Sequence, residues 1–189
     1  MNDNTFKSGQ LHWQNLNWLW LSAVVIGTDA ATKWAAMRYL EYANPIPVTG
    51  YFNLTLLHNP GAAFSFLANS GGWQRWGFAI LAGLVTLGLV VWLLRTPRVM
   101  PGNPTRRGVG LTKVAIALII GGALGNLIDR LMLGYVVDFL DLHARGYHWP
   151  AFNIADSAIT VGVVLLLVFE LLPHRAHPLE TDRPDNPQP

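Results

Sequence analysis

The chain has 189 residues, of which 51% are hydrophobic and only 13% are charged, and its formal net charge is +2. Ordinary soluble domains carry about 25% charged residues, so this composition indicates a membrane protein. The sequence contains no cysteine, which excludes disulfides, thiol nucleophiles and thiolate metal sites.

Four apolar segments are long enough to cross a membrane as helices. A helix needs about 20 residues to span the ~30 Å hydrocarbon core at 1.5 Å per residue. The sequence therefore predicts a mainly α membrane protein with four transmembrane helices, over residues 16–40, 73–94, 111–133 and 154–172. We expect residues 16–173 to form one four-helix domain, preceded by a cytoplasmic segment over 1–15. The Pro-rich tail 174–189 is predicted to be cytoplasmic and disordered.

The connector between the second and third segments fixes the predicted orientation. It contains five of the thirteen Lys and Arg residues and no acidic residue: Arg95, Arg98, Arg106, Arg107 and Lys113. The positive-inside rule places this connector and both termini in the cytoplasm, and segments 41–72 and 134–153 on the outer side. The clustering gives the basic residues a membrane explanation, so we do not expect nucleic acid as a partner.

The outer segment 44–68 is predicted to be extended rather than helical. It contains Pro45 and Pro47, and then a run from Tyr51 to His58 that is rich in β-branched and aromatic residues. A small sheet at the membrane surface with exposed apolar groups could hold an extended peptide by strand addition. The four predicted helices are thus joined to a small extracytoplasmic β-rich segment.

The third helix carries polar residues on one face. Asn126, Asp129 and Arg130 are spaced i, i+3 and i+4, so they share a helix face. An Arg pointing into the bundle could bind main-chain carbonyls or orient a carboxylate, whereas the simpler alternative is an Asp129–Arg130 pair that ends the helix. In the first helix, Asp29 and Lys33 are at i and i+4, which predicts an intramembrane ion pair.

Two aspartates lie beside apolar sequence on the predicted outer side. A carboxylate costs about 2.5–3.5 kcal/mol at the bilayer centre, so Asp138 and Asp156 indicate acid–base chemistry with a shared proton. Asp156 falls in the first turn of the fourth helix, with Asn153 at the expected cap position. Because a helix N-terminus favours negative charge, we expect Asp156 to be ionised and Asp138 to hold the proton.

The remaining polar motifs are less specific. Asn59-Pro60-Gly61 predicts a turn, and its outer location also makes Asn59 a candidate substrate-facing amide. The spacing of the outer histidines 58, 143 and 148 matches no zinc pattern, so the predicted metal and cofactor content is none.

Taken together, these stretches resemble the bacterial lipoprotein signal peptidase (signal peptidase II) family. The matching motifs occur in the family's order and cover residues 16–172. They are Asp29…Lys33, Asn59-Pro60-Gly61-Ala62-Ala63-Phe64, Gly125-Asn126-Leu127-Ile128-Asp129-Arg130, Val136-Val137-Asp138-Phe139 and Phe152-Asn153-Ile154-Ala155-Asp156-Ser157. The resemblance implies an aspartic endopeptidase of the bacterial inner membrane, with its active site on the periplasmic side. Such enzymes remove signal peptides from prolipoproteins, cutting before a Cys that already carries a diacylglyceryl group.

The resemblance also implies roles for individual residues. Asp138 and Asp156 would be the catalytic pair, and Asn59, Asn126, Arg130 and Asn153 would surround the substrate peptide. Asp29, Lys33, Asp129 and Gly61 would support the site. The expected partners are prolipoproteins with a diacylglyceryl-Cys, membrane lipid and cyclic peptide inhibitors of the globomycin type, and we expect a monomer.

Two other classes of protein fit part of the pattern. A small transporter or proton-conducting subunit would also hold intramembrane carboxylates, but its charges would be spaced through the bilayer, often with an inverted repeat. The sequence shows neither feature. A structural assembly factor would use its aspartates only to pair with Arg130 and Lys33.

Overall fold

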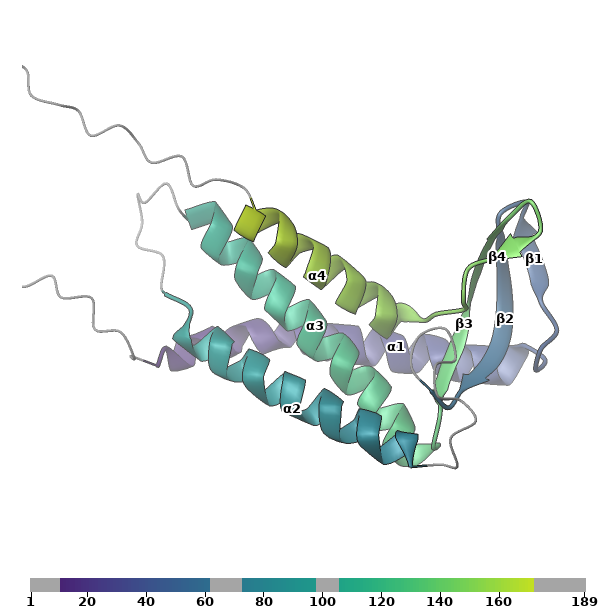
Figure 1. Cartoon of the computed structure of the whole chain (residues 1–189), viewed down its shortest axis with the longest axis horizontal. Helices are drawn as coiled ribbons and strands as arrows, with labels where there is room; N and C mark the ends of the chain where they lie inside the picture. The colour runs from purple at the N-terminus through teal and green to yellow at the C-terminus, as the bar shows by residue number, and fades with distance from the viewer. Residues whose placement is uncertain (1–10, 62–72, 98–105, 172–189) are drawn as a thin grey trace, which may run out of the picture.

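The computed structural model describes residues 11–61, 73–97 and 106–171 of the chain. Residues 1–10 of the predicted cytoplasmic segment, part of the strand-like segment 44–68, residues 98–105 of the basic connector and the C-terminal tail therefore lie outside the described residues. Four helices run side by side, and a small sheet lies at one end of them (Figure 1). We call this the sheet end of the bundle.

The four predicted helices are confirmed. They are α1 (Leu19–Tyr39), α2 (Gln74–Arg95), α3 (Arg106–Met132) and α4 (Ile154–Leu171). A short 3-10 helix, η1 (Trp13–Trp18), precedes α1, in part of the segment that we expected to lie before the domain. By length and composition, α2 (Arg75–Arg95) and α3 (Gly108–Met132) can cross a membrane, whereas the apolar helical run Ile154–Phe169 is shorter.

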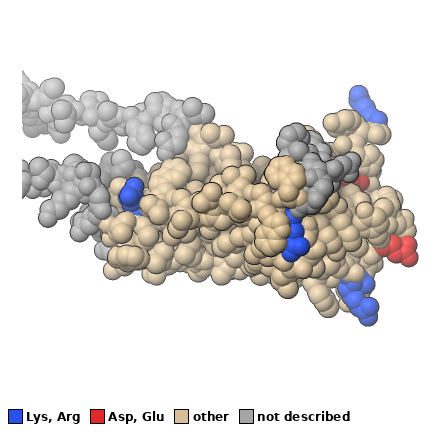
Figure 2. Space-filling model, turned by 60° about the horizontal axis from the view of Figure 1, so that its bottom comes forward, with Lys and Arg blue, Asp and Glu red and all other residues tan. Residues whose placement is uncertain are grey.

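The surface of α2 is typical of a helix that faces lipid. Ile80, Leu84 and Leu87 are each 62% exposed, although burying such side chains away from water is strongly favourable. The view in Figure 2 includes a broad stretch between the two ends of the molecule on which no charged side chain appears. Both features fit a bundle that is surrounded by hydrocarbon.

Helix α3 lies at the centre and packs against each of the other three helices. Small residues allow the close approach: a Cβ on Gly122 would lie 2.3 Å from the Ala155 carbonyl oxygen of α4. A Cβ on Gly121 would lie 2.8 Å from the Cβ of Val25 in α1. Glycine is therefore required where α3 crosses its neighbours, as in other membrane helix pairs with small interface residues.

The sheet has four antiparallel strands in the order β1-β2-β3-β4. Strands β1 (Ile46–Thr49) and β2 (Phe52–Asn59) confirm the extended conformation predicted in this region. Strands β3 (Val136–Ala144) and β4 (Tyr147–His148) were not predicted. Their segment was expected only to lie on the outer side, since β3 acquires its hydrogen-bond partner from a strand about 80 positions earlier in the chain.

The connection between α3 and β3 places the sheet against the bundle. The chain leaves α3 through Gly134, whose φ of +89° is readily adopted only by glycine. Val137 and Phe139 of β3 then pack with Leu56 of β2 and Ala36 of α1 in one buried cluster. This cluster fixes the sheet on the end of α1, so that the face carrying Asp138 meets the first turn of α4.

Candidate active site

Asp138 lies in the middle of β3 and is almost fully buried, with 3% of its surface exposed. Its two carboxyl oxygens accept hydrogen bonds from two side-chain amides. The Nδ2 group of Asn59 donates to Oδ2 over 3.0 Å, and the Nδ2 group of Asn153 donates to Oδ1 over 2.8 Å. The two amides come from different parts of the fold, which fixes the position of the carboxyl group.

Asp156 lies in the first turn of α4, where Asn153 caps the helix as predicted. The main-chain N–H of Asp156 donates to Asn153 Oδ1 over 2.9 Å, and the N–H of Asn153 donates back to Asp156 Oδ2 over 3.3 Å. This is the reciprocal arrangement of a capping box. The other oxygen, Oδ1, accepts a 2.7 Å hydrogen bond from Asn126 Nδ2.

Asn153 therefore joins the two carboxyl groups, since it donates to Asp138 while exchanging hydrogen bonds with Asp156. The proximity has an electrostatic consequence. Burial, followed by the negative charge of Asp156, raises the pKa of Asp138 from 3.8 to about 7. The raised pKa of Asp138 is in the direction predicted for it, and the ionised state predicted for Asp156 stays a prediction.

Lys33 of α1 contacts three side chains that surround the two aspartates. Its Nζ lies 2.7 Å from Asp29 Oδ2 and 2.9 Å from Asp129 Oδ2, and donates to Asn126 Oδ1 over 3.0 Å. The ion pair predicted between Asp29 and Lys33 is therefore present. Of the alternatives left open for Asp129, the ion pair seen among the described residues is the one with Lys33 of α1, and no ion pair between Asp129 and Arg130 is present among them.

The two acidic partners of Lys33 also hold the main chain. Asp29 Oδ1 accepts the N–H of Ala155 over 2.9 Å, at the start of α4. Asp129 Oδ2 accepts the N–H of Val137 over 3.1 Å, one residue before Asp138. Lys33 thus anchors the helix that carries one aspartate and the strand that carries the other.

Arg130 binds main-chain carbonyls, which is one of the two roles that the sequence left open for it. Its Nη2 group donates to the carbonyl oxygen of Gly61 over 2.9 Å, and Nη1 donates to that of Asn126 over 3.3 Å. The guanidinium also lies over the ring of Phe78, 5.4 Å from its centroid. Arg130 therefore ties the end of the Asn59-Pro60-Gly61 turn to α3.

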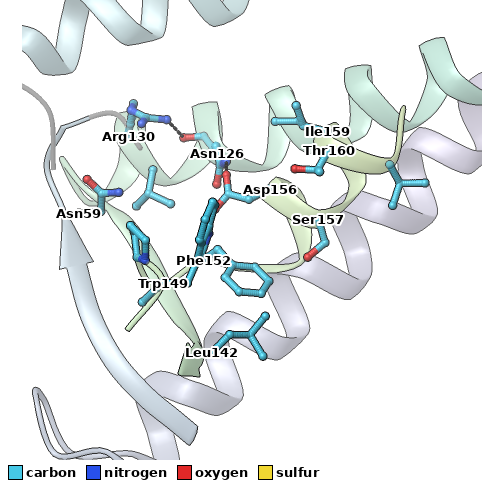
Figure 3. A pocket seen from close by; sticks show the side chains of 14 residues that line it. Asn59, Asn126, Arg130, Leu142, Trp149, Phe152, Asp156, Ser157, Ile159 and Thr160 are labelled. Atoms are coloured by element: carbon cyan, nitrogen blue, oxygen red, sulfur yellow. Dashed lines mark hydrogen bonds between the residues drawn. The ribbon is translucent and has the colours of Figure 1, made fainter. Parts of the chain in front are cut away.

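Two cavities adjoin the carboxyl groups. The first has a volume of about 760 Å³ and is lined by Asn59, Asn126, Arg130 and Asp156 together with apolar residues of α4 (Figure 3). The second has a volume of about 630 Å³, and Asp138 is among its lining residues. Asn153 is fully buried and is not among the residues that line either cavity, so its predicted contact with the substrate stays a prediction.

The structure also contains a polar cluster that the sequence did not single out. Asp141 accepts hydrogen bonds from Asn53 Nδ2 over 2.8 Å and from His148 Nδ1 over 2.9 Å. His143 stacks on His148 and contacts Asn53. No local signal could have revealed this cluster, because it depends on the pairing of β2 with β3 and of β3 with β4.

A bundle with an apolar surface, two carboxyl groups linked through one amide and an adjoining cavity together define the class: a membrane enzyme of the aspartic peptidase type. Comparison with known proteins identifies the family. A family model described as signal peptidase (SPase) II matches residues 21–172. The chain therefore belongs to the signal peptidase II family of aspartic endopeptidases.

Individual relatives agree with this assignment. The chain is 53% identical over 173 residues to a lipoprotein signal peptidase of Acinetobacter baumannii, covering 92% of this chain and 93% of the relative. It is 52% identical over 154 residues to a lipoprotein signal peptidase of Ralstonia nicotianae, covering 82% and 83% of the two chains. Among solved structures, it is similar to a bacterial membrane enzyme determined by the in meso method at 2.3 Å resolution. That similarity has a TM-score of 0.68 and 31% sequence identity, and covers 82% of this chain and 87% of the other.

Proposed function

We propose that this endopeptidase cleaves prolipoproteins immediately before a diacylglyceryl-modified Cys, with Asp138 and Asp156 as the catalytic residues. The observation that carries the proposal is the bridge through Asn153, which holds both carboxyl groups in one hydrogen-bonded unit. The different surroundings of the two groups favour a single shared proton, as an aspartic peptidase requires. No cofactor is needed for this chemistry.

The proposed reaction begins with a water molecule between the two carboxyl groups. Ionised Asp156 accepts a proton from the water, whose oxygen attacks the scissile carbonyl carbon. Asp138 donates its proton to the carbonyl oxygen, which gives a neutral tetrahedral intermediate. Collapse of the intermediate breaks the C–N bond: Asp138 takes back a proton from a hydroxyl group of the intermediate, and Asp156 donates its proton to the leaving amine. The raised pKa of Asp138, about 7, supports its part as the acid.

The neighbouring polar residues divide into two proposed roles. Asn59, Asn126 and Arg130 line the first cavity, so we assign them to the substrate peptide. Asn153 is the positioning residue for both aspartates, because its burial leaves no surface for a peptide. Asp29, Lys33, Asp129 and Gly61 support the site through the contacts described above. Cyclic peptides of the globomycin type would compete for the first cavity.

We infer that the enzyme is a monomer of the bacterial inner membrane, with four transmembrane helices and both termini in the cytoplasm. The sheet and the catalytic pair would then face the periplasm. The basic residues between α2 and α3 support this orientation. So do the exposed aromatic residues at the sheet end, Trp73, Trp76, Tyr147 and Trp149, which suit a membrane-interface belt.

One assay tests the proposed reaction. The purified protein is incubated with a diacylglyceryl-modified prolipoprotein, and release of the signal peptide is followed for wild type, Asp156→Ala and Glu41→Gln. Glu41 is a matched control, an exposed carboxylate near the sheet that bonds only to Asn44 among the described hydrogen bonds. Cleavage by wild type and Glu41→Gln alone is expected. Equal cleavage by Asp156→Ala, or none by wild type, would contradict the proposal.

The proposed orientation can be tested separately because the chain has no native cysteine. Tyr147→Cys places one thiol on the sheet, and Pro97→Cys places one at the opposite end of the bundle. In intact spheroplasts, a membrane-impermeant maleimide should label only the first variant. Labelling of only the second would show the reverse orientation.

A further inference from the structure

The second cavity is not accounted for by the catalytic chemistry alone. It lies against β2 and β3, with a volume of about 630 Å³, and Asp138 and Asp141 both line it. Asn59 and the segment 149–151 line the first cavity as well. The two cavities therefore lie side by side next to the two aspartates. A peptide that passes the aspartates could occupy both cavities.

The chemistry of the two cavities differs. The first extends along α4 past Ile159, Thr160 and Val161, and its charged lining residues include Arg130 (Figure 3). The second contains two carboxyl groups, and none of the described residues that line it is Lys or Arg. We assign the apolar residues before the scissile bond to the first cavity, which leaves the second for the residues after it.

Asp141 is held so that its charge is retained. Although burial opposes ionisation, hydrogen bonds from His148 and Asn53 lower the pKa of Asp141 below 3.8. The carboxylate is fixed between strands β2 and β4 by those same two contacts. These contacts favour the ionised form of Asp141 at the second cavity, where His148 also lines the wall.

The spacing along β3 indicates which substrate residues would meet this charge. An extended chain advances about 3.3 Å per residue, so Asp141 lies roughly 10 Å along the strand from Asp138. A substrate extended from the scissile bond would bring its second to fourth residues beyond the cut near Asp141. The residue immediately after the cut, which comes before these three, is the lipidated Cys. Its acyl chains remain in the bilayer.

We propose that the second cavity is the binding site for the mature side of the substrate chain, and that Asp141 makes it selective for basic side chains two to four residues after the scissile bond. This inference rests on the proposed cleavage of prolipoproteins. It assigns to the sheet a part in substrate selection that is separate from the catalytic step.

The test compares two lipidated prolipoproteins that differ only at residues two to four after the scissile bond, with Lys in one and Glu in the other. Because partly exposed charge pairs are weak, wild type should cleave the Lys substrate with a kcat/KM about two- to fivefold higher. Asp141→Asn should bring the ratio close to one, and the control Glu41→Gln should keep the wild-type ratio. Moving the charged residues to positions ten to twelve should also abolish the ratio.

A second measurement needs no variant. Raising the salt from about 0.05 to 0.5 M should reduce the wild-type ratio, since screening weakens such interactions. Equal cleavage of both substrates by wild type would overturn the proposed subsite and leave the proposed reaction intact. An unchanged ratio in Asp141→Asn would likewise overturn the part assigned to Asp141. Failure of wild type to cleave either substrate would instead contradict the proposed reaction.

Discussion

The bundle contains two buried lysines that each donate a hydrogen bond to an asparagine side chain. The two asparagines then bind different kinds of group. At the sheet end, Lys33 donates to the Oδ1 atom of Asn126, whose Nδ2 group donates to Asp156. At the opposite end, Lys113 donates to the Oδ1 atom of Asn15 over 2.9 Å. The Nδ2 group of Asn15 donates to the carbonyl oxygens of Leu93 and Thr96, at the end of α2.

The difference lies in what the asparagine holds. Asn15 donates to two main-chain carbonyls at the C-terminal end of α2, where helix carbonyls run short of partners, so the Lys113 cluster has a structural part. Asn126 holds the carboxyl group of Asp156, which lines a cavity, so the Lys33 cluster supports the proposed catalytic pair. A buried Lys–Asn pair is therefore not by itself evidence of a functional site. The group that the asparagine amide binds distinguishes the two clusters.

The largest expected effect comes from removing the proton of Asp138 while keeping its shape. Asp138→Asn should reduce kcat at least about 10³-fold, because loss of a catalytic group removes transition-state stabilisation. At the other end, Asn15→Ala should cost about 1–3 kcal/mol of stability by leaving buried carbonyls unsatisfied, with cleavage unchanged. Signal-peptide release and Trp-fluorescence melting in detergent measure the two effects. Turnover by Asp138→Asn would remove Asp138 from the mechanism.

Replacing each lysine by Met tests the comparison directly. Lys33→Met leaves Asp29 and Asp129 buried without their cation and releases the main-chain anchors of both aspartates. We expect a loss of about 3–5 kcal/mol in stability and about 10²-fold in cleavage per folded molecule. Lys113→Met should leave cleavage within about twofold. Equal losses of activity in the two variants would contradict the division between a reactive and a structural end.

The pH dependence of cleavage should be set by Asp138 at the sheet end and not by the Lys113 cluster at the opposite end. Because the pKa of Asp138 is about 7, the carboxyl group loses its proton as the pH rises through 7. The cleavage rate should then fall. Above the pKa of Asp138, each further pH unit should lower the rate by about tenfold. The stability that this group contributes is present below pH 4 and is lost as the pH rises through 7. Initial rates between pH 5.5 and 9 measure the effect, and Asn15→Ala should show the wild-type profile. A flat profile would contradict a proton on Asp138.

The smallest expected effects come from substituting a glycine at a close helix contact, Gly122 of α3, and a glycine with open space beside it, Gly88 of α2. The Cβ of Gly122→Ala would meet Ala155 beside Asp156, so we expect a loss of about 1–3 kcal/mol and a several-fold decrease in cleavage. A Cβ on Gly88 of α2 would meet no atom within 4 Å apart from its own stretch of helix, and Gly88→Ala should stabilise the protein by about 0.4–1 kcal/mol. Melting curves of the two variants, beside their cleavage rates, make the comparison. A stable and fully active Gly122→Ala variant would show that α4 can shift without affecting the site.

Much of the architecture follows from the sequence because its signals are local. The long apolar runs determine four helices, and the residues around 46–59 determine the first two strands. Asn153 three residues before Asp156 is a cap signal that can be recognised within a single turn. The Asp29–Lys33 pair follows from helix periodicity. These features need only neighbours within a few residues, so one sequence is enough to predict them.

The tertiary structure alone decided which polar groups meet. Strand β3 forms because β2 lies beside it, and Asn59 reaches Asp138 across 79 positions of sequence. Asp129 pairs with Lys33 instead of its neighbour Arg130 because α1 brings the ammonium group into reach. The burial of Asn153 and the second cavity beside Asp141 likewise depend on how the sheet closes over the bundle. Such contacts join segments that are distant in sequence, and no local pattern specifies which of several possible partners will lie close enough to bind.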